Sequence, residues 1–383
     1  MEETKVLHKK KVIAPKLRFK GYNDEWKSKN IGSILSVGSG RDYKHLGNGN
    51  IPVFGTGGLM TMVDKFLYDG ATVCIGRKGT IDKPMYFEGK LWTVDTLFYT
   101  HSFVESNPKF VYNLFQKIKW KEHNEASGVP SLSKTTIEKL KIYIPSLPEQ
   151  QKIASFLSAV DEKIQLLNRK KQLLEQYKKG VMQQLFSGQL SFKDENGKAY
   201  PKWEEKKLGP LIQIKSGYTP SNYDFNANGI NPFLKVEELN NSEKYQSESR
   251  FYTDNNENLI KKNSVIFPKR GAAILNNKVR INTVDVLIDT NLMALIPIEG
   301  VLHYEYLYYK IFSEKLYKIA DCSTIPQINN KHIEPYKIPL PSYEEQKRIA
   351  DFLVAIDVKI EKVAEALEAT AKFKKGLLQQ MFV

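Results

Sequence analysis

Two cysteines in a chain of 383 residues are too few for a disulfide framework. Cys74 and Cys322 lie far apart in the sequence, as is usual in the reducing cytoplasm. The six histidines are scattered and form no Cys/His spacing of the kind that binds zinc. No apolar run reaches the roughly 18 residues of a membrane-spanning helix. We therefore expect a cytoplasmic protein without a metal site.

Motifs for catalysis are equally scarce. The sequence has no G-x-x-x-x-G-K-[ST] loop for a nucleoside triphosphate, and Gly38–Gly40 is not a dinucleotide fingerprint. Asn231–Phe233 resembles only part of an adenine methyltransferase motif. Asp82 with Glu88–Lys90 resembles the Asp…Glu-x-Lys pattern of metal-dependent nucleases, but so short a pattern is common by chance. We expect no catalytic residue, and a stand-alone DNA methyltransferase or nuclease is the alternative.

Positive charge is in excess and is concentrated in the first half of the chain. The formal net charge is +14. Residues 1–190 hold 30 Lys and Arg against 18 Asp and Glu, whereas the remainder holds 27 against 25. Such an excess favours a polyanionic partner, usually a nucleic acid.

One long segment occurs twice. Residues 141–186 align without gaps with residues 337–382, and 20 of the 46 positions are identical. A second echo opens each half, where "WKSKNIGSILSVGSG" from Trp26 resembles "WEEKKLGPLIQIKSG" from Trp203. The offset is 196 residues in the first alignment and 177 in the second. The chain is therefore a tandem duplication in which each copy has a variable module followed by a shared segment.

The shared segments are predicted to be long helices. Prolines precede both, which is a helix-start signal, and apolar residues then recur every seven residues as in a coiled-coil seam. The seam is interrupted by Lys171 and Lys178 in the first helix and by Thr370 and Lys374 in the second. Each helix is expected to pair with the other, and packing on its own module is the alternative. The expected pairing residues are Ile153, Leu157, Val160, Ile164, Leu167, Leu174, Ile349, Leu353, Ile356, Ile360, Val363 and Leu367.

The variable modules are predicted to be α+β. Short β-prone runs such as 71–76, 91–100 and 279–288 are separated by turn residues, and one main helix is expected in each module, over 108–120 and 303–319. Several loops combine cations, amides and aromatic residues, which are the groups that contact base edges and phosphates. The residues expected to contact DNA are Arg41, Tyr43, Lys44, Arg77, Lys78, Lys83, Lys134, Lys215, Tyr218, Lys269, Arg270, Asn276, Asn277, Lys278, Gln327, Asn329, Asn330 and Lys331.

With these features the whole chain resembles a specificity subunit of a type I restriction–modification enzyme. The matching stretches include "IGRKGTIDKPMYFEGKLWTVDTLFY" from Ile75, "FPKRGAAILNNKVRI" from Phe267 and the junction "GVPSLSKTTIEKLKIYIPSLPEQQKIASFLSAVDEKI". The resemblance implies two target recognition domains, each reading one half of a bipartite, asymmetric DNA site. It also implies that the two helices form an antiparallel coiled coil that sets the spacing. A coiled-coil adaptor that binds protein is a further alternative.

The resemblance also implies the division of labour. This chain would bind no cofactor, while two modification subunits would use S-adenosylmethionine and restriction subunits would use ATP and Mg²⁺. The expected domains are an N-terminal extension (1–14), target recognition domain 1 (15–144), a central helix (145–187), target recognition domain 2 (188–338) and a C-terminal helix (339–383).

Overall fold

A computed structural model describes residues 13–321 and 325–383 of the chain. The chain divides into two compact units, of which the first contains residues 1–170 with 363–383 and the second residues 171–362. Each long helix contributes one part to each unit. Most of the expected N-terminal extension, and Cys322, lie outside the described residues. In the part of the chain that is described, no helix is both long and apolar enough to cross a bilayer.

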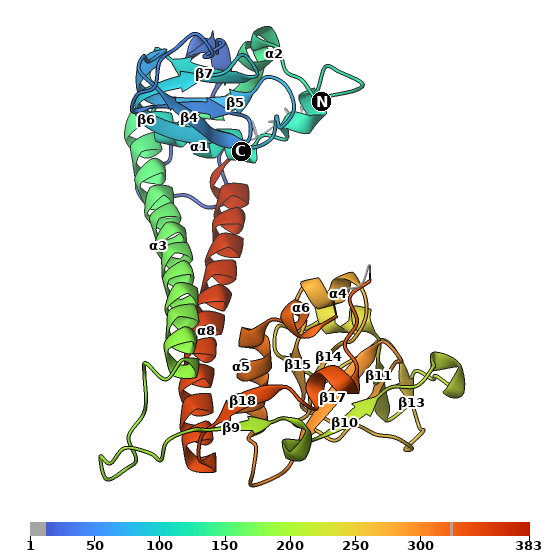
Figure 1. The fold of residues 1–383 in the computed structure, drawn as a ribbon. Coiled ribbons are helices and arrows are strands. Elements are labelled where there is room, and N and C mark those ends of the chain that lie inside the picture. Colours follow the sequence, from blue (N-terminus) through green and yellow to red (C-terminus); the bar gives the residue numbers. More distant parts are fainter. Residues whose placement is uncertain (1–12, 322–324) are drawn as a thin grey trace, which may run out of the picture. The chain divides into compact units, whose positions relative to one another are not determined.

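The first unit is built on a six-stranded sheet (Figure 1), and its strand order is β2-β7-β5-β6-β3-β4. The bounds are β2 Ser36–Ser39, β3 Ile51–Gly55, β4 Gly58–Val63, β5 Tyr68–Gly76, β6 Met85–Thr93 and β7 Leu97–His101. A separate pair joins β1 (Lys27–Asn30) to β8 (Lys141–Ile144), so the opening echo of the repeat pairs with the strand before the long helix. The predicted run 71–76 lies in β5, whereas the run 91–100 covers the end of β6, a turn and most of β7.

Two helices complete this module. α1 (Pro108–Lys117) begins at Asn107, whose side chain accepts hydrogen bonds from the Lys109 and Phe110 amides. α2 (Lys134–Lys139) begins at Ser133, whose hydroxyl accepts from the Thr136 amide. Each side chain satisfies amides that lack partners in the first helical turn. α1 confirms the main helix predicted for the first module.

The second unit carries two sheets. The larger has the order β10-β17-β14-β15-β12 and the smaller β13-β11-β16, while β9 pairs with β18 as β1 pairs with β8. The strands are β9 Glu204–Lys207, β10 Ile212–Ser216, β11 Asn231–Leu234, β12 Tyr245–Gln246, β13 Tyr252–Thr253, β14 Val265–Pro268, β15 Arg280–Asn282, β16 Leu287–Ile288, β17 Leu292–Pro297 and β18 Lys337–Leu340. The helices are α4 Ala272–Leu275, α5 Tyr304–Glu314, α6 Leu316–Ile319 and α7 Asn330–Ile333. α5 with α6 occupies the predicted range 303–319.

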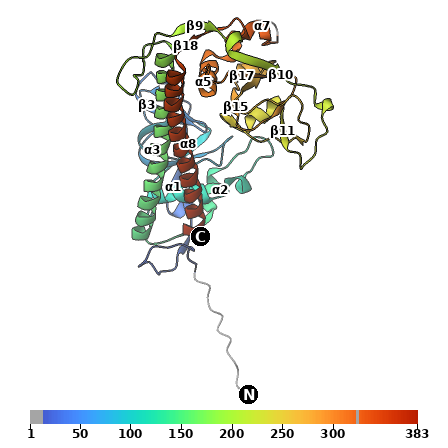
Figure 2. The same cartoon turned by 90° about the horizontal axis from the view of Figure 1, so that it is seen from below.

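The repeated segments form the helices α3 (Leu147–Phe186) and α8 (Tyr343–Met381). In the first unit, one apolar cluster contains the start of α3, the last turns of α8 and residues of α1 and β5. There the two helices run beside each other in both views (Figures 1 and 2). In the second unit, the end of α3 and the start of α8 likewise share one cluster with α5 and β17.

Two of the three lysines that interrupt the apolar seam pair with an aspartate of the other helix, whereas Lys171 pairs with Glu175 on its own helix. In the first unit the Lys374 ammonium lies 2.6 Å from Asp161 Oδ1. In the second unit Lys178 pairs with Asp357. Asp161 and Asp357 are equivalent in the repeat, and so are Lys178 and Lys374. Two of the four interruptions of the heptad pattern, Lys178 and Lys374, are therefore one ion pair that occurs twice.

Candidate nucleic-acid interface

Two predicted loops of the first unit are brought together by backbone contacts. Lys78 forms an isolated antiparallel bridge with Ser131. The Gly79 amide donates to the Pro130 carbonyl oxygen at 2.8 Å, and the Leu132 amide donates to the Arg77 carbonyl oxygen at 2.9 Å. These bonds join the loop after β5 to the loop before α2, and we call this arrangement the basic clasp.

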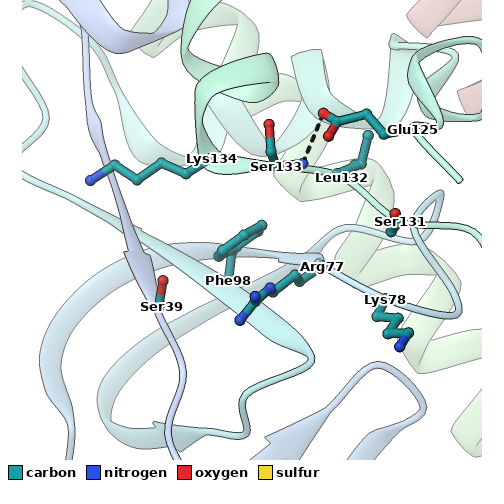
Figure 3. Close-up of a pocket in the computed structure, with 9 residues that line it drawn as sticks. All are labelled: Ser39, Arg77, Lys78, Phe98, Glu125, Ser131, Leu132, Ser133 and Lys134. Carbon is teal, nitrogen blue, oxygen red and sulfur yellow. Dashed lines mark hydrogen bonds between the residues drawn. The ribbon is translucent and has the colours of Figure 1, made fainter.

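The basic clasp lines a cleft of about 460 Å³ (Figure 3). Arg77 extends toward Ser39, and its guanidinium carbon lies 5.9 Å from the centre of the Phe98 ring. Lys78 points away on the other side. The residues lining the cleft are Ser39, Arg77, Lys78, Phe98, Glu125, Ser131, Leu132, Ser133 and Lys134. Three cations, three hydroxyl groups and an aromatic ring thus lie together at one end of the strands β2, β5 and β7.

Glu125 is the one acidic group among the residues that line the cleft. Its carboxylate accepts a hydrogen bond from the Ser133 amide at 3.1 Å. Hydrogen bonds from Thr136 and Ser133 hold the pKa of Glu125 below its ordinary value. The carboxylate is therefore used to fix the loop at the start of α2, which orders the edge of the cleft.

The second unit contains the same clasp. Arg270 forms an isolated antiparallel bridge with Gln327, the Gly271 amide donates to the Pro326 carbonyl oxygen at 3.0 Å, and the Ile328 amide donates to the Lys269 carbonyl oxygen at 2.9 Å. Arg77 thus corresponds to Lys269, and Lys78 to Arg270. This correspondence has an offset of 192 residues, between those of the two sequence echoes.

A close backbone approach fixes the neighbouring loop in both units. A Cβ atom added at Gly40 would lie 2.0 Å from the Val94 carbonyl oxygen, and one at Gly217 would lie 2.0 Å from that of Ile288. Only glycine fits so near another backbone. The following amides bond across the same approach, from Arg41 to the Thr93 carbonyl oxygen at 2.8 Å and from Tyr218 to that of Ile288 at 3.1 Å.

Known proteins share this architecture and its sequence. The family model for the type I restriction modification DNA specificity domain matches residues 23–176 and 200–369, which are the two copies of the repeat. The chain belongs to this family. It is a DNA specificity subunit with two target recognition domains.

Two relatives from Methanocaldococcus jannaschii are named specificity subunits. The MjaVIII subunit is 27% identical over 339 residues, which is 82% of this chain and 76% of the relative. The putative MjaX subunit is 32% identical over 279 residues, which is 70% of this chain and 63% of the relative. The fold resembles a crystal structure of the specificity subunit from M. genitalium, with a TM-score of 0.67 at 17% identity, covering 97% of this chain and 99% of that one.

The remaining predicted contacts of the first target recognition domain lie in different surroundings. Tyr43 is partly buried against the cluster around Trp92, so its ring supports the Gly40 loop. Arg41, Lys44 and Lys83 are exposed. The Arg41 carbonyl oxygen accepts from the Trp92 indole at 2.8 Å, which leaves the guanidinium at the surface.

In the second target recognition domain, several predicted contacts are engaged within the specificity subunit. Asn277 is buried, and its amide group donates to the Phe312 carbonyl oxygen and accepts from the Leu316 amide. Asn329 is the N-cap of α7. Lys278 donates to Asn240, and Lys215 to the Leu259 carbonyl oxygen. Tyr218, Arg270, Asn276, Asn330 and Lys331 are exposed, whereas Gln327 is half-buried.

Lys269 is half-buried at the base of the second clasp. Its ammonium donates to Ser216 Oγ at 2.9 Å, and burial together with the nearby Arg270 lowers the pKa of Lys269. Ser216 lies opposite Met293 between β10 and β17, as Ser39 lies opposite Phe98 between β2 and β7. Ser39 and Ser216 lie within two of the predicted basic loops, and the sequence prediction passed over them and Phe98 because it selected cations, amides and tyrosines.

The residues of the two short sequence patterns that resemble nuclease and methyltransferase motifs are bonded to other residues of the specificity subunit. Asp82 pairs with Lys121 at 2.8 Å, and Glu88 accepts from the Tyr86 hydroxyl at 2.9 Å. The Asn231 amide donates to the Asn255 carbonyl oxygen and to Asn256 Oδ1. Among residues 13–321 and 325–383, no group of three or more His, Cys, Asp or Glu side chains could hold a metal ion.

Proposed function

We propose that this specificity subunit is a non-catalytic reader in which each target recognition domain binds one half of a bipartite, asymmetric DNA site. The basic clasp, present in both domains with cations at the same two positions, carries this proposal. Two target recognition domains with the same clasp but different sequences are suited to bind two half-sites of different sequence. The chain would thereby direct adenine methylation and restriction by partner subunits.

The proposed DNA surface combines the clasps with the loops that follow Gly40 and Gly217. Arg and Lys side chains there would hold phosphates and guanine edges, and exposed amides would meet adenine edges. Five predicted contacts are left out because their side chains are packed or hydrogen-bonded within the chain: Tyr43, Lys215, Asn277, Lys278 and Asn329. The surface comprises Arg41, Lys44, Arg77, Lys78, Lys83, Lys134, Tyr218, Lys269, Arg270, Asn276, Gln327, Asn330 and Lys331.

We further propose that α3 and α8 pair as an antiparallel coiled coil related by a pseudo-twofold axis. Support comes from each unit separately. The start of α3 packs with the end of α8 in the first unit, and the end of α3 with the start of α8 in the second. The ion pair between Asp161 and Lys374 and that between Lys178 and Asp357 are equivalent in the repeat. The paired helices would set half-site spacing and present a docking surface for two modification subunits.

The cofactors of the assembled enzyme would belong to its other subunits. Modification subunits would bind S-adenosylmethionine, and restriction subunits would use ATP and Mg²⁺. This chain would supply only DNA recognition and the docking surface. We expect the complex to act in the cytoplasm, where the buried thiol of Cys74 stays reduced.

The proposal is tested with the complex of this chain and its modification subunits. The recognised site is first identified by methylation mapping in cells that carry both. Binding to that site is then measured against salt for the double variant Arg77→Ala, Lys78→Ala. We expect weaker binding and a salt slope that is shallower by about one.

The matched control is Lys139→Ala, Lys141→Ala, which removes the same charge from exposed positions near β8. Unchanged affinity and slope in the clasp variant would mean that the clasp does not contact DNA. Binding of a purified protein partner without any preference for one bipartite sequence would favour the adaptor alternative.

A further inference from the structure

The two cations of each clasp are held very differently. Arg77 and Lys269 occupy the inner position, where the backbone is bonded on both sides. Their amides donate to the carbonyl oxygens of Thr96 and Asn291, each at 2.8 Å, and their own carbonyl oxygens accept from Leu132 and Ile328, each at 2.9 Å. The inner residue is therefore anchored directly after an interior strand of the sheet, β5 in the first domain and β14 in the second.

The inner side chains are also oriented. Arg77 lies over the Phe98 ring, and Lys269 donates one hydrogen bond to Ser216. Both contacts involve facing residues of the same strand pair, β2–β7 in one domain and β10–β17 in the other. Arg77 Nη1 also donates to the Asp95 carbonyl oxygen at 3.5 Å, which further fixes the guanidinium while its other N–H groups stay available. The Lys269 ammonium, with one bond to Ser216, retains two more donors.

The outer side chains have no such restraint. Within the described ranges 13–321 and 325–383, neither the Lys78 ammonium nor the Arg270 guanidinium makes a hydrogen bond or ion pair. In Figure 3 Lys78 extends away from Arg77. Both residues are exposed. A phosphate contact needs only a mobile charge near the backbone, whereas base reading needs donors held at a defined angle.

We propose that Arg77 and Lys269 read base edges, with guanine O6 and N7 as their targets, while Lys78 and Arg270 bind phosphates. This inference rests on the proposed function and assigns a separate role to each position. The order of the cations is inverted between the domains, Arg inside in the first and Lys inside in the second. The inner guanidinium presents a rigid fork of donors and the inner ammonium a single point charge, so the two domains would read their half-sites by different geometry.

The test uses variants that keep the charge. Binding of the complex is measured on the mapped site and on every single-base change in each half-site. Arg77→Lys should lose roughly 5- to 100-fold affinity for the mapped site and relax preference at one position of the first half-site. Lys78→Arg should leave the preference unchanged, and Lys78→Ala should weaken all sequences alike.

The second domain repeats the test independently. Lys269→Arg should alter the preference at one position of the second half-site only, and Arg270→Lys should not. If a thermal melt shows that Arg77→Lys unfolds the first domain, the variants Lys269→Arg and Arg270→Lys still test the assignment. The assignment is wrong if the inner variants weaken all sequences uniformly or if the outer variants change base preference. Failure of the proposed function would be different, because the unmodified complex would then show no preference for the mapped site.

Discussion

Lys374 offers a direct test of helix pairing in the first unit. Its ammonium lies 2.6 Å from Asp161 Oδ1 and 2.9 Å from Gln116 Oε1, and only 11% of the side chain is exposed. Lys374→Met removes both contacts but keeps an unbranched chain of similar length in the apolar cluster. The substitution therefore isolates the charge from the packing.

The expected loss of stability in Lys374→Met depends on how far its partner Asp161 is exposed to water. A hydrogen bond to a charged group contributes about 1.5–3 kcal/mol when its partner is left without compensation. Asp161 keeps 27% exposure of its side chain, so water would solvate part of the abandoned carboxylate. We therefore expect Lys374→Met to lower the local opening free energy by about 2 kcal/mol.

A double variant of Lys374 and Asp161 distinguishes loss of the ion pair from a general loss of stability. Replacing a buried ion pair by apolar groups is often neutral, whereas removing one partner alone is costly. Lys374→Met with Asp161→Leu should therefore recover most of the loss. A double-mutant cycle should give a coupling of about 1–2 kcal/mol between these side chains.

Hydrogen exchange of the full chain is the suitable assay because it reports local opening. Amides of residues 375–381 should exchange about 30-fold faster in Lys374→Met, which corresponds to 2 kcal/mol. Lys372→Met, an exposed position on the same helix, is the control and should behave like the unmodified chain. The reasoning fails if Lys374→Met leaves exchange unchanged, or if the double variant opens more readily than the single one.

Four further predictions concern the repeated segments and the modules between them. Burial raises the pKa of Glu345 despite its hydrogen bond from the Trp203 indole. The stabilising contribution of the protonated form is complete below the unfolded-state pKa of about 4 and is lost as pH rises through the raised folded-state pKa. Glu345→Gln should therefore gain melting temperature over the unmodified chain as pH rises through this range. The equivalent Glu149→Gln should instead lose about 1–3 kcal/mol at neutral pH, because Arg18 bonds both carboxylate oxygens of Glu149; equal melting of the two variants would contradict this contrast. Exchanging residues 200–336 for the module of another specificity subunit should change one half-site in methylation mapping, and a change in both would exclude two independent readers. Four residues inserted near 170–173, with a matching insertion near Leu367 to restore the seam, add about 6 Å to the helices. Both half-site sequences should stay the same, and the spacer between them should lengthen by one or two base pairs. Altered half-sites at unchanged spacing would refute the spacing role.

The elements that the sequence predicted best are those with strong periodicity. The seven-residue repeat located α3 and α8, and the β-prone runs located β5, β7, β15 and β16. The clasp could not be predicted, because Arg77 and Leu132 meet through backbone bonds that carry no side-chain pattern. The role of Lys374 was hidden for another reason. A heptad pattern marks a lysine as a defect unless the facing residue is known, although Asp161 and Lys374 recur as Asp357 and Lys178.

The longer second module shows how a variable domain is fastened to a shared helix. In the first unit β3 and β4 are joined by the short turn Thr56–Gly57, whereas residues 235–251 join β11 to β13. This longer connection carries Lys244, whose buried ammonium lies 2.6 Å from Glu305 Oε2, 2.7 Å from the Tyr309 hydroxyl and 3.6 Å from Asp357 Oδ2.

Asp357 is thus shared between Lys178 of α3 and Lys244 of the module, while the Tyr309 hydroxyl also donates to it. Exchange of residues 200–336 removes Lys244 and Tyr309 but leaves Lys178 in place. Asp357 would then keep one cation, so the helices would retain their ion pair whatever the new module supplies. Because the shared pair lies entirely on α3 and α8, the recognition surface can vary without leaving a buried charge unpaired in the helices.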